Sequence, residues 1–168
     1  MPLCELLHKS IVASGGNKND TVCEICQIAK QVVLDTGIIA RIIPEQKQKE
    51  WIRSDGTIRP DCFSPNKKCL FKISCIDKNT EFETSIDTFK TLTRYNLYGF
   101  AELDVEKIKT ECPFLKIVKD NYAYYGNDCL DFKNHCSMMS FGGTNLKELN
   151  SELKHKSNLA KISVLKVF

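Results

Sequence analysis

Hydrophobic side chains between residues 86 and 100 recur with the 3.6-residue period of an α-helix. One side of the helical wheel carries Ile86, Phe89, Leu92 and Asn96, and the opposite, polar side carries Asp87, Lys90, Thr91 and Arg94. We therefore predict an amphipathic helix that begins near Asp87, whose carboxylate suits the N-terminal amides, and ends at Gly99, which tolerates a positive φ.

The rest of the chain alternates between helix-like and strand-like patterns. Helical spacing predicts a helix over residues 22–34 and a helical turn over residues 38–43 that ends near Pro44. Further predicted elements are a turn at residues 54–57, a strand over 69–75, a helix over 102–109, strands over 114–118 and 121–125, and a small, flexible segment over 137–143. Together these elements indicate an α+β protein with an antiparallel sheet.

The last 24 residues form a lysine-rich segment in which three leucines have heptad spacing. Leu146, Leu149 and Leu153 are followed in the same register by Lys156 and Ala160, so the heptad pattern ends within three turns. A coiled coil needs this pattern over three or four heptads. We therefore predict one short docked helix and a monomeric protein.

Length and composition predict one domain with extensions. The chain has 168 residues, of which 42% are hydrophobic and 27% charged, which suffices for one core. It has no basic leader at its start and no run of about 18 apolar residues, so we expect a soluble protein with neither a signal peptide nor a membrane partner. Nine cysteines, an odd number, are typical of reduced thiols in the cytosol or nucleus.

The net charge of +3 is compatible with a polyanionic partner, but the charges are unevenly distributed. Residues 41–78 hold nine basic and five acidic side chains, whereas residues 79–112 hold four and seven. The predicted amphipathic helix therefore lies in an acidic segment. This distribution argues against tight nonspecific DNA binding through that segment alone.

Three stretches resemble the DNA-binding domain of heat-shock transcription factors. The sequence Asn96-Leu-Tyr-Gly-Phe100 resembles the end of the family's recognition helix. Trp51-Ile-Arg-Ser-Asp-Gly-Thr57 resembles its turn between the first strands, and residues 121–130 resemble its closing segment. The resemblance covers residues 22–136, which leaves residues 1–21 as an N-terminal extension and 137–168 as a C-terminal extension.

This resemblance implies a winged helix-turn-helix, in which three helices pack on a small antiparallel sheet and the third helix enters the major groove of duplex DNA. The implied DNA-contacting residues are Lys90, Thr91, Thr93, Arg94 and Asn96. A sequence-specific regulator of transcription in the nucleus is the implied function.

The aligned positions depart from the family at the base-reading residue. Thr93 falls where the family has a base-reading arginine, and threonine cannot make the bidentate contact of arginine to guanine. Arg94 is the substitute candidate, and Lys90 would contact phosphate. The alternative is a protein-interaction module on a winged-helix scaffold that has lost DNA binding.

The cysteines and histidines offer two candidate metal sites. Cys23 and Cys26 have the spacing of zinc ligands, and Cys4 with His8 could complete the set. On a helix the same cysteines would instead be packed side by side, and we favour that interpretation, with no metal and no cofactor. In the second, less specific site, spacing alone does not select partners among Cys62, Cys69, Cys75, Cys129, His135 and Cys136, and we favour packing there too.

The sequence does not indicate an enzyme. A redox enzyme would need the cysteine pair at a helix start after a strand, and a polar loop precedes Cys23. His8, His135 and His155 lie in polar settings that do not suggest a Ser-His-Asp arrangement, and no phosphate-binding loop or carboxylate pair stands out.

Overall fold

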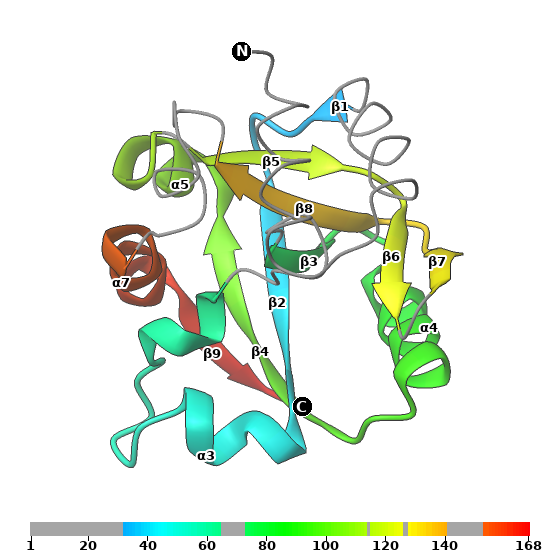
Figure 1. The fold of residues 1–168 in the computed structure, drawn as a ribbon, viewed down its shortest axis with the longest axis horizontal. Helices are drawn as coiled ribbons and strands as arrows, with labels where there is room; N and C mark the ends of the chain where they lie inside the picture. The colour runs from blue at the N-terminus through cyan, green and yellow to red at the C-terminus, as the bar shows by residue number, and fades with distance from the viewer. Residues whose placement is uncertain (1–31, 65–72, 114, 126–127, 141–152) are drawn as a thin grey trace.

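The computed structural model describes residues 32–64, 73–113, 115–125, 128–140 and 153–168 (Figure 1). Its strands are β1 (Val32–Val33), β2 (Ile38–Pro44), β3 (Ile73–Asp77), β4 (Leu97–Asp104), β5 (Leu115–Lys119), β6 (Tyr122–Tyr125), β7 (Asp128–Asp131), β8 (His135–Ser140) and β9 (Val164–Val167). Its helices are α3 (Gln48–Trp51), α4 (Phe82–Thr93), α5 (Val105–Glu111) and α7 (Leu153–Ile162), with 3₁₀ turns η1 (Glu45–Lys47) and η2 (Pro60–Phe63).

Seven of these strands form one antiparallel sheet in the order β1-β5-β8-β3-β2-β4-β9, and β6 pairs with β7 in a separate hairpin. The longest pairing joins β2 to β4, from Ile38 opposite Asp104 to Pro44 opposite Leu97. The β9 strand, near the C-terminus, is the outermost strand next to β4.

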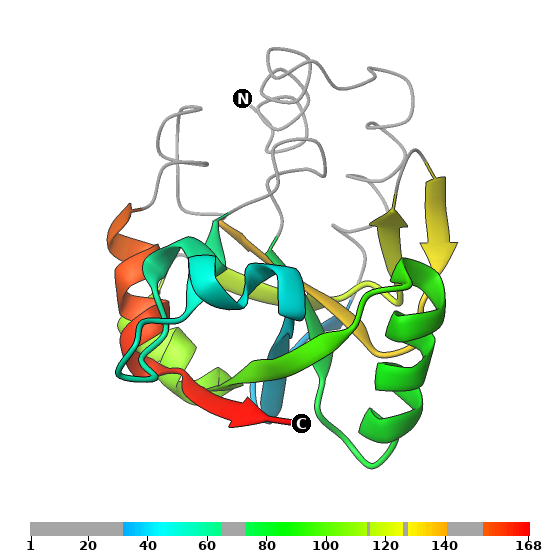
Figure 2. The ribbon, with the colours of Figure 1, turned by 90° about the horizontal axis from the view of Figure 1, so that it is seen from below.

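Hydrophobic residues pack on both faces of the sheet. The larger cluster includes Ile39, Cys75, Leu103, Cys136 and Met138, and residues of α5, α7 and η2 pack against it. The smaller cluster, with Ala40, Ile42, Ile76, Phe100 and Phe132, is covered by α4. Figure 2 shows α4 on one side of the molecule and α5 with α7 on the other.

The predicted amphipathic helix exists, but its ends are wrong. It begins at Phe82 and ends at Thr93, and Arg94 after it has a left-handed φ of 57°. Gly99 does not terminate this helix, because Leu97–Asp104 is a strand whose backbone pairs with both β2 and β9. Pairing with two neighbouring strands satisfies the backbone groups that a longer helix would have used.

Other local predictions have mixed outcomes. Residues 38–43 are not a helical turn but lie in β2. Four of these six residues are isoleucine, whose branched side chain favours a strand. The helix predicted over residues 22–34 is wrong at Val32–Val33, which form strand β1. Residues 22–31 lie outside the described part of the chain.

Nearer the C-terminus the predictions are again partly right. The helix expected at 102–109 is displaced to Val105–Glu111, where the Asp104 side chain caps it by accepting from the Glu106 N–H at 2.9 Å. Residues 137–140, predicted to be flexible, belong to β8. The predicted C-terminal helix is present as α7, although Leu146 and Leu149 lie outside the described residues.

The prediction of an α+β protein with an antiparallel sheet is confirmed, whereas the winged helix is not. A winged helix has three helices on a small sheet, and a seven-stranded sheet is larger than that fold uses. The predicted boundary after residue 136 falls inside β8, and β9 joins the same sheet. No helix among the described residues is long and apolar enough to cross a membrane.

Candidate active site

The register of three neighbouring strands gathers polar side chains on one face of the sheet. Strand β8 lies between β5 and β3, with Ser137 opposite Ser74 on one side and Val118 on the other. Side chains two residues apart on a strand share a face. His135 therefore lies on the same face as Ser74 and Ser137, and Asp120, just after β5, continues that face beside it.

These side chains form a continuous chain of hydrogen bonds. His135 Nδ1 lies 2.7 Å from Asp120 Oδ1, and His135 Nε2 lies 2.9 Å from Ser74 Oγ. The Ser137 hydroxyl donates to the other carboxylate oxygen of Asp120 at 2.6 Å. We call the Ser74, His135 and Asp120 side chains the relay.

The proton positions in the relay follow from the donor and acceptor inventory. A carboxylate only accepts, so His135 Nδ1 carries the proton shared with Asp120. In a neutral imidazole Nε2 is then an acceptor, so the Ser74 hydroxyl donates to it. This is the tautomer in which a histidine can take a proton from a serine hydroxyl.

Burial differs along the relay. Asp120 and His135 are 3% and 2% exposed, whereas Ser74 is only partly buried; Ser137, which contacts Asp120, is 0% exposed. A polar pair enclosed in a low-dielectric interior interacts more strongly than in water. The relay therefore has a buried, fixed end at Asp120 and an outer end at the Ser74 hydroxyl.

Two asparagines shape the turns that carry the relay. Asn121 and Asn134 have left-handed φ values of 54° and 71°, which asparagine tolerates better than most residues. The Asn134 N–H donates to Asn121 Oδ1 at 3.1 Å, and the Asn121 N–H donates to the His135 carbonyl at 3.2 Å. These bonds tie Asn121, the residue after Asp120, to Asn134 and to the backbone of His135. They therefore help to fix the distance between Asp120 and His135.

Arg41 holds the backbone of the serine in place. Strand β2 pairs with β3 only at Ile39 and Ala40, so the two strands are not paired beside Ser74. Arg41 spans this gap, with Nη1 donating to the Ser74 carbonyl at 3.0 Å and Nε donating to the Cys62 carbonyl at 3.0 Å. The backbone of Ser74 is thus anchored while its side chain remains on the relay face.

The predicted DNA-contacting residues occupy the end of α4 and the segment after it. Lys90, Thr91, Arg94 and Asn96 are exposed, and Thr93 is partly exposed. The Thr91 hydroxyl donates to the Asp87 carbonyl at 3.0 Å, and the Thr93 hydroxyl donates to the Phe89 carbonyl at 2.8 Å. The structure brings Lys90, Thr91 and Arg94 to one side of the helix, whereas Asn96 lies beyond its end.

Four cysteines, Cys62, Cys75, Cys112 and Cys136, are free and buried. Burial raises the pKa of Cys62 to about 11, that of Cys75 to about 12 and that of Cys112 to about 11. These thiols are therefore protonated near neutral pH and are poor nucleophiles or metal ligands.

In the described ranges no group of three or more His, Cys, Asp and Glu side chains is arranged to hold a metal. The candidate zinc set of Cys4, His8, Cys23 and Cys26 lies outside those ranges.

The relay was missed in the sequence because its members are far apart in the chain. His135 lies 61 residues from Ser74 and 15 from Asp120. The available signal was local: His135 and Ser137 alternate with Cys136 and Met138, as side chains of a strand do.

A scan against protein-family models gives no match, and searches of curated proteins and of solved structures give none either.

Proposed function

We propose that the protein catalyses acyl transfer from an ester-type substrate, with hydrolysis as the simplest outcome. In this proposal Ser74 is the nucleophile, His135 is the general base and Asp120 orients the imidazole. The observation that carries the proposal is the unbroken chain of hydrogen bonds from a buried carboxylate to a partly exposed serine. Nucleophile and base within hydrogen-bond reach, with the base oriented by a third group, are the general signature of such a site.

The proposed step balances without any further reagent except water. Ser74 Oγ forms a bond to the carbonyl carbon of the ester while its proton moves to His135 Nε2. The tetrahedral intermediate then expels the alcohol, which takes the proton from His135. Water, activated by the same imidazole, releases the acid and restores the Ser74 hydroxyl.

A purely structural polar cluster is the competing interpretation. Such a cluster needs a hydrogen-bond partner for each buried polar group. His135 and Ser137 already provide one partner for each carboxylate oxygen of Asp120. The Ser74 hydroxyl also contributes to that satisfaction, because it is the partner of the buried His135 Nε2. What favours a chemical role is that Ser74, unlike Asp120 and His135, is partly exposed.

Hydrolysis of a small activated ester tests this function. Wild-type protein should hydrolyse p-nitrophenyl acetate faster than the Ser74→Ala variant does. Ser157→Ala is the matched control, because Ser157 is also a partly buried serine but has no hydrogen bond to either histidine that the structure describes. Equal rates for the wild type and the Ser74→Ala variant, both folded, would contradict the proposal.

DNA binding through α4 is a second candidate function. Its support is the exposure of Lys90, Thr91 and Arg94 on one side of a helix, together with the resemblance to heat-shock factors. A nuclear role in transcription rests on the same resemblance. Against it, Glu83 and Asp87 are exposed on the same helix, and phosphate neutralisation dominates DNA affinity.

Duplex binding at several salt concentrations tests the second candidate. Arg94→Ala should remove a preference at one base pair, at a cost of about 1–3 kcal/mol, while Lys90→Ala should weaken all sequences alike. If folded protein shows no salt-dependent binding to any duplex, this candidate fails. The alternative is then that the exposed side of α4 binds a protein partner.

A further inference from the structure

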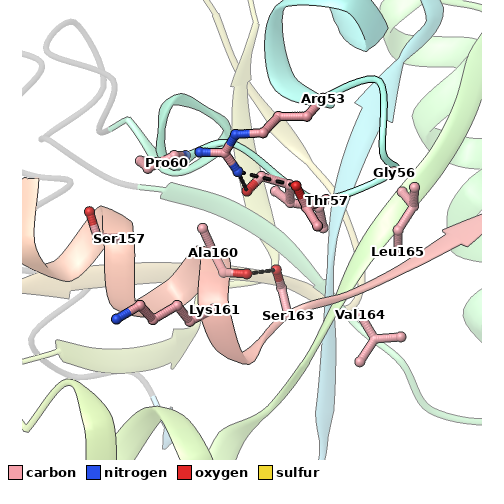
Figure 3. Close-up of a pocket in the computed structure, with 11 residues that line it drawn as sticks. Arg53, Gly56, Thr57, Pro60, Ser157, Ala160, Lys161, Ser163, Val164 and Leu165 are labelled. Atoms are coloured by element: carbon pink, nitrogen blue, oxygen red, sulfur yellow. Dashed lines mark hydrogen bonds between the residues drawn. The ribbon is translucent and has the colours of Figure 1, made fainter.

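A pocket lies on the part of the molecule formed by α7, β9 and the turn before η2. This pocket has a volume of about 700 Å³, within the range of roughly 300–1,000 Å³ that is usual for small-molecule sites. Figure 3 shows Arg53 and Thr57 on one side and Ser157, Lys161 and Val164 on the other. The pocket therefore has walls from segments about 100 residues apart in the sequence.

The charge of the pocket is positive. Arg53 and Lys161 line it, and none of its lining residues is acidic. Neither cation forms an ion pair within the described part of the chain. The nearest turn carries Asp55, whose carboxylate accepts from both the N–H and the hydroxyl of Thr57, at 2.9 and 2.7 Å.

The guanidinium of Arg53 is held in position. Its Nη1 donates to Thr57 Oγ1 at 3.3 Å and to the Ile58 carbonyl at 3.2 Å, as the dashed lines in Figure 3 show. Both acceptors are neutral, although, after the hydrogen bonds from Thr57, the charge of Arg53 also helps to lower the pKa of the nearby Asp55 carboxyl. A guanidinium has five N–H donors, so a group that uses one nitrogen for the fold retains donors for an oxyanion.

The remaining wall is apolar. Ile58, Ala160, Val164 and Leu165 line the pocket beside the two cations. Val164 is 52% exposed and so leaves apolar area that a ligand can cover.

We propose that this pocket binds a small organic phosphate monoester, whose phosphate lies between Arg53 and Lys161 and whose hydrocarbon part covers the apolar wall. A phosphate monoester carries about two negative charges near neutral pH, which suits a pocket lined by two cations and by no acidic residue. The pocket takes a ligand of different chemistry from the substrate of the relay.

The pocket and the relay are on different faces of the sheet. Ala160 and Leu165 pack against the cluster that contains Cys75 and Cys136. The relay residue Ser74 precedes Cys75 on the same strand and so points to the opposite face. Binding in the pocket is therefore an inference independent of the proposed acyl transfer.

Calorimetric titration with phenyl phosphate at low salt tests the proposal. We expect a Kd below about 1 mM for the wild type. Arg53→Gln and Lys161→Gln should each raise this Kd by roughly tenfold, the loss expected for one charge-assisted contact. Because Arg53 also supports the turn, Lys161→Gln is the cleaner variant, since the Lys161 ammonium has no hydrogen bond or ion pair within the described residues.

Lys116→Gln is the matched control, since Lys116 is an exposed lysine on β5, away from the pocket. Its Kd should equal that of the wild type, inorganic phosphate should bind more weakly than phenyl phosphate, and phenol should not bind. The proposal is overturned if phenyl phosphate does not bind, if all three variants weaken it equally, or if inorganic phosphate binds as tightly.

Discussion

Ser74 and Ser137 lie directly opposite each other on β3 and β8, yet their hydroxyls contact opposite ends of one hydrogen-bonded chain. The Ser137 hydroxyl donates to Asp120 in the interior, and the Ser74 hydroxyl meets His135 at the outer end. If Ser74 is the nucleophile that we propose, the two serines separate a structural contribution from a chemical one within a single cross-strand pair.

Stability should depend on the inner serine more than on the outer one. Ser137→Ala removes a hydrogen bond to a buried carboxylate, and we expect it to lower the free energy of unfolding by about 1.5–3 kcal/mol. Ser74→Ala, at a partly exposed position, should cost about 0.5–1 kcal/mol. Urea unfolding followed by the fluorescence of Trp51, the only tryptophan, measures both values. A larger cost for Ser74→Ala would mean that its hydroxyl is chiefly structural.

Asp120→Asn should separate orientation of the imidazole from packing. The amide has the shape of the carboxylate but can also donate, so it no longer fixes the proton on His135 Nδ1. We expect ester hydrolysis to fall by about 10³–10⁴-fold, as for other relays that lose the correct tautomer. Circular dichroism should show a folded protein. A folded variant with nearly wild-type activity would remove Asp120 from the mechanism.

Gly99→Ala should detach β9 from the sheet. A Cβ at Gly99 would overlap the backbone oxygen of Lys166 and lie 3.0 Å from Val167 Cα, and this backbone cannot move without breaking the pairing of β4 with β9. We expect faster amide hydrogen exchange in residues 164–167.

Gly56→Ala is the control for this exchange experiment, because Gly56 has open space around it and only its φ of 84° resists a side chain. It should leave the exchange of β9 unchanged. Slow exchange in β9 of the Gly99→Ala variant would show that this close approach is not needed.

Alkaline pH should destabilise the protein through its buried thiols. Burial raises the pKa of Cys75 from 9.0 to about 12, so between these values the unfolded state has lost a proton that the folded state keeps. The contribution to stability is complete below pH 9 and falls as pH rises, by about 1.4 kcal/mol per pH unit for one such thiol.

Unfolding at pH 8, 9.5 and 10.5 under reducing conditions measures this slope. Cys75→Ala removes the thiol, so its stability should start lower because of the lost packing but should decline less steeply than that of the wild type. Parallel pH profiles would contradict a protonated buried thiol at this position.

The sequence predicts local structure correctly where the spacing of hydrophobic residues within one element is sufficient to define its buried side. The core side of α4 was correctly placed, since Ile86 is buried and Phe89 and Leu92 pack against the same cluster. The end of the helix was placed wrongly, because Gly99 suggests a helix terminator in the sequence. In the structure Gly99 lies in β4 instead, where the absence of a side chain lets the β9 backbone approach closely.

The relay could not be predicted for a related reason. Ser74, His135 and Asp120 meet only through the pairing of β3, β8 and β5, and strand order is not written in any one segment. Of the three stretches that resemble heat-shock factors, residues 96–100 were expected to end a helix, but the structure places them before and within β4. The inference about α4 therefore depends chiefly on its exposed face.

The most direct measurement for the central claim is covalent labelling of Ser74 by a fluorophosphonate, with the modified residue located by peptide mass spectrometry. Labelling tests the nucleophile itself, whereas turnover also requires donors that stabilise the oxyanion. The account predicts one adduct, on Ser74, which is lost in the Ser74→Ala and His135→Ala variants and retained in Ser157→Ala. An unlabelled native protein, or labelling that persists in a folded Ser74→Ala variant, would contradict it.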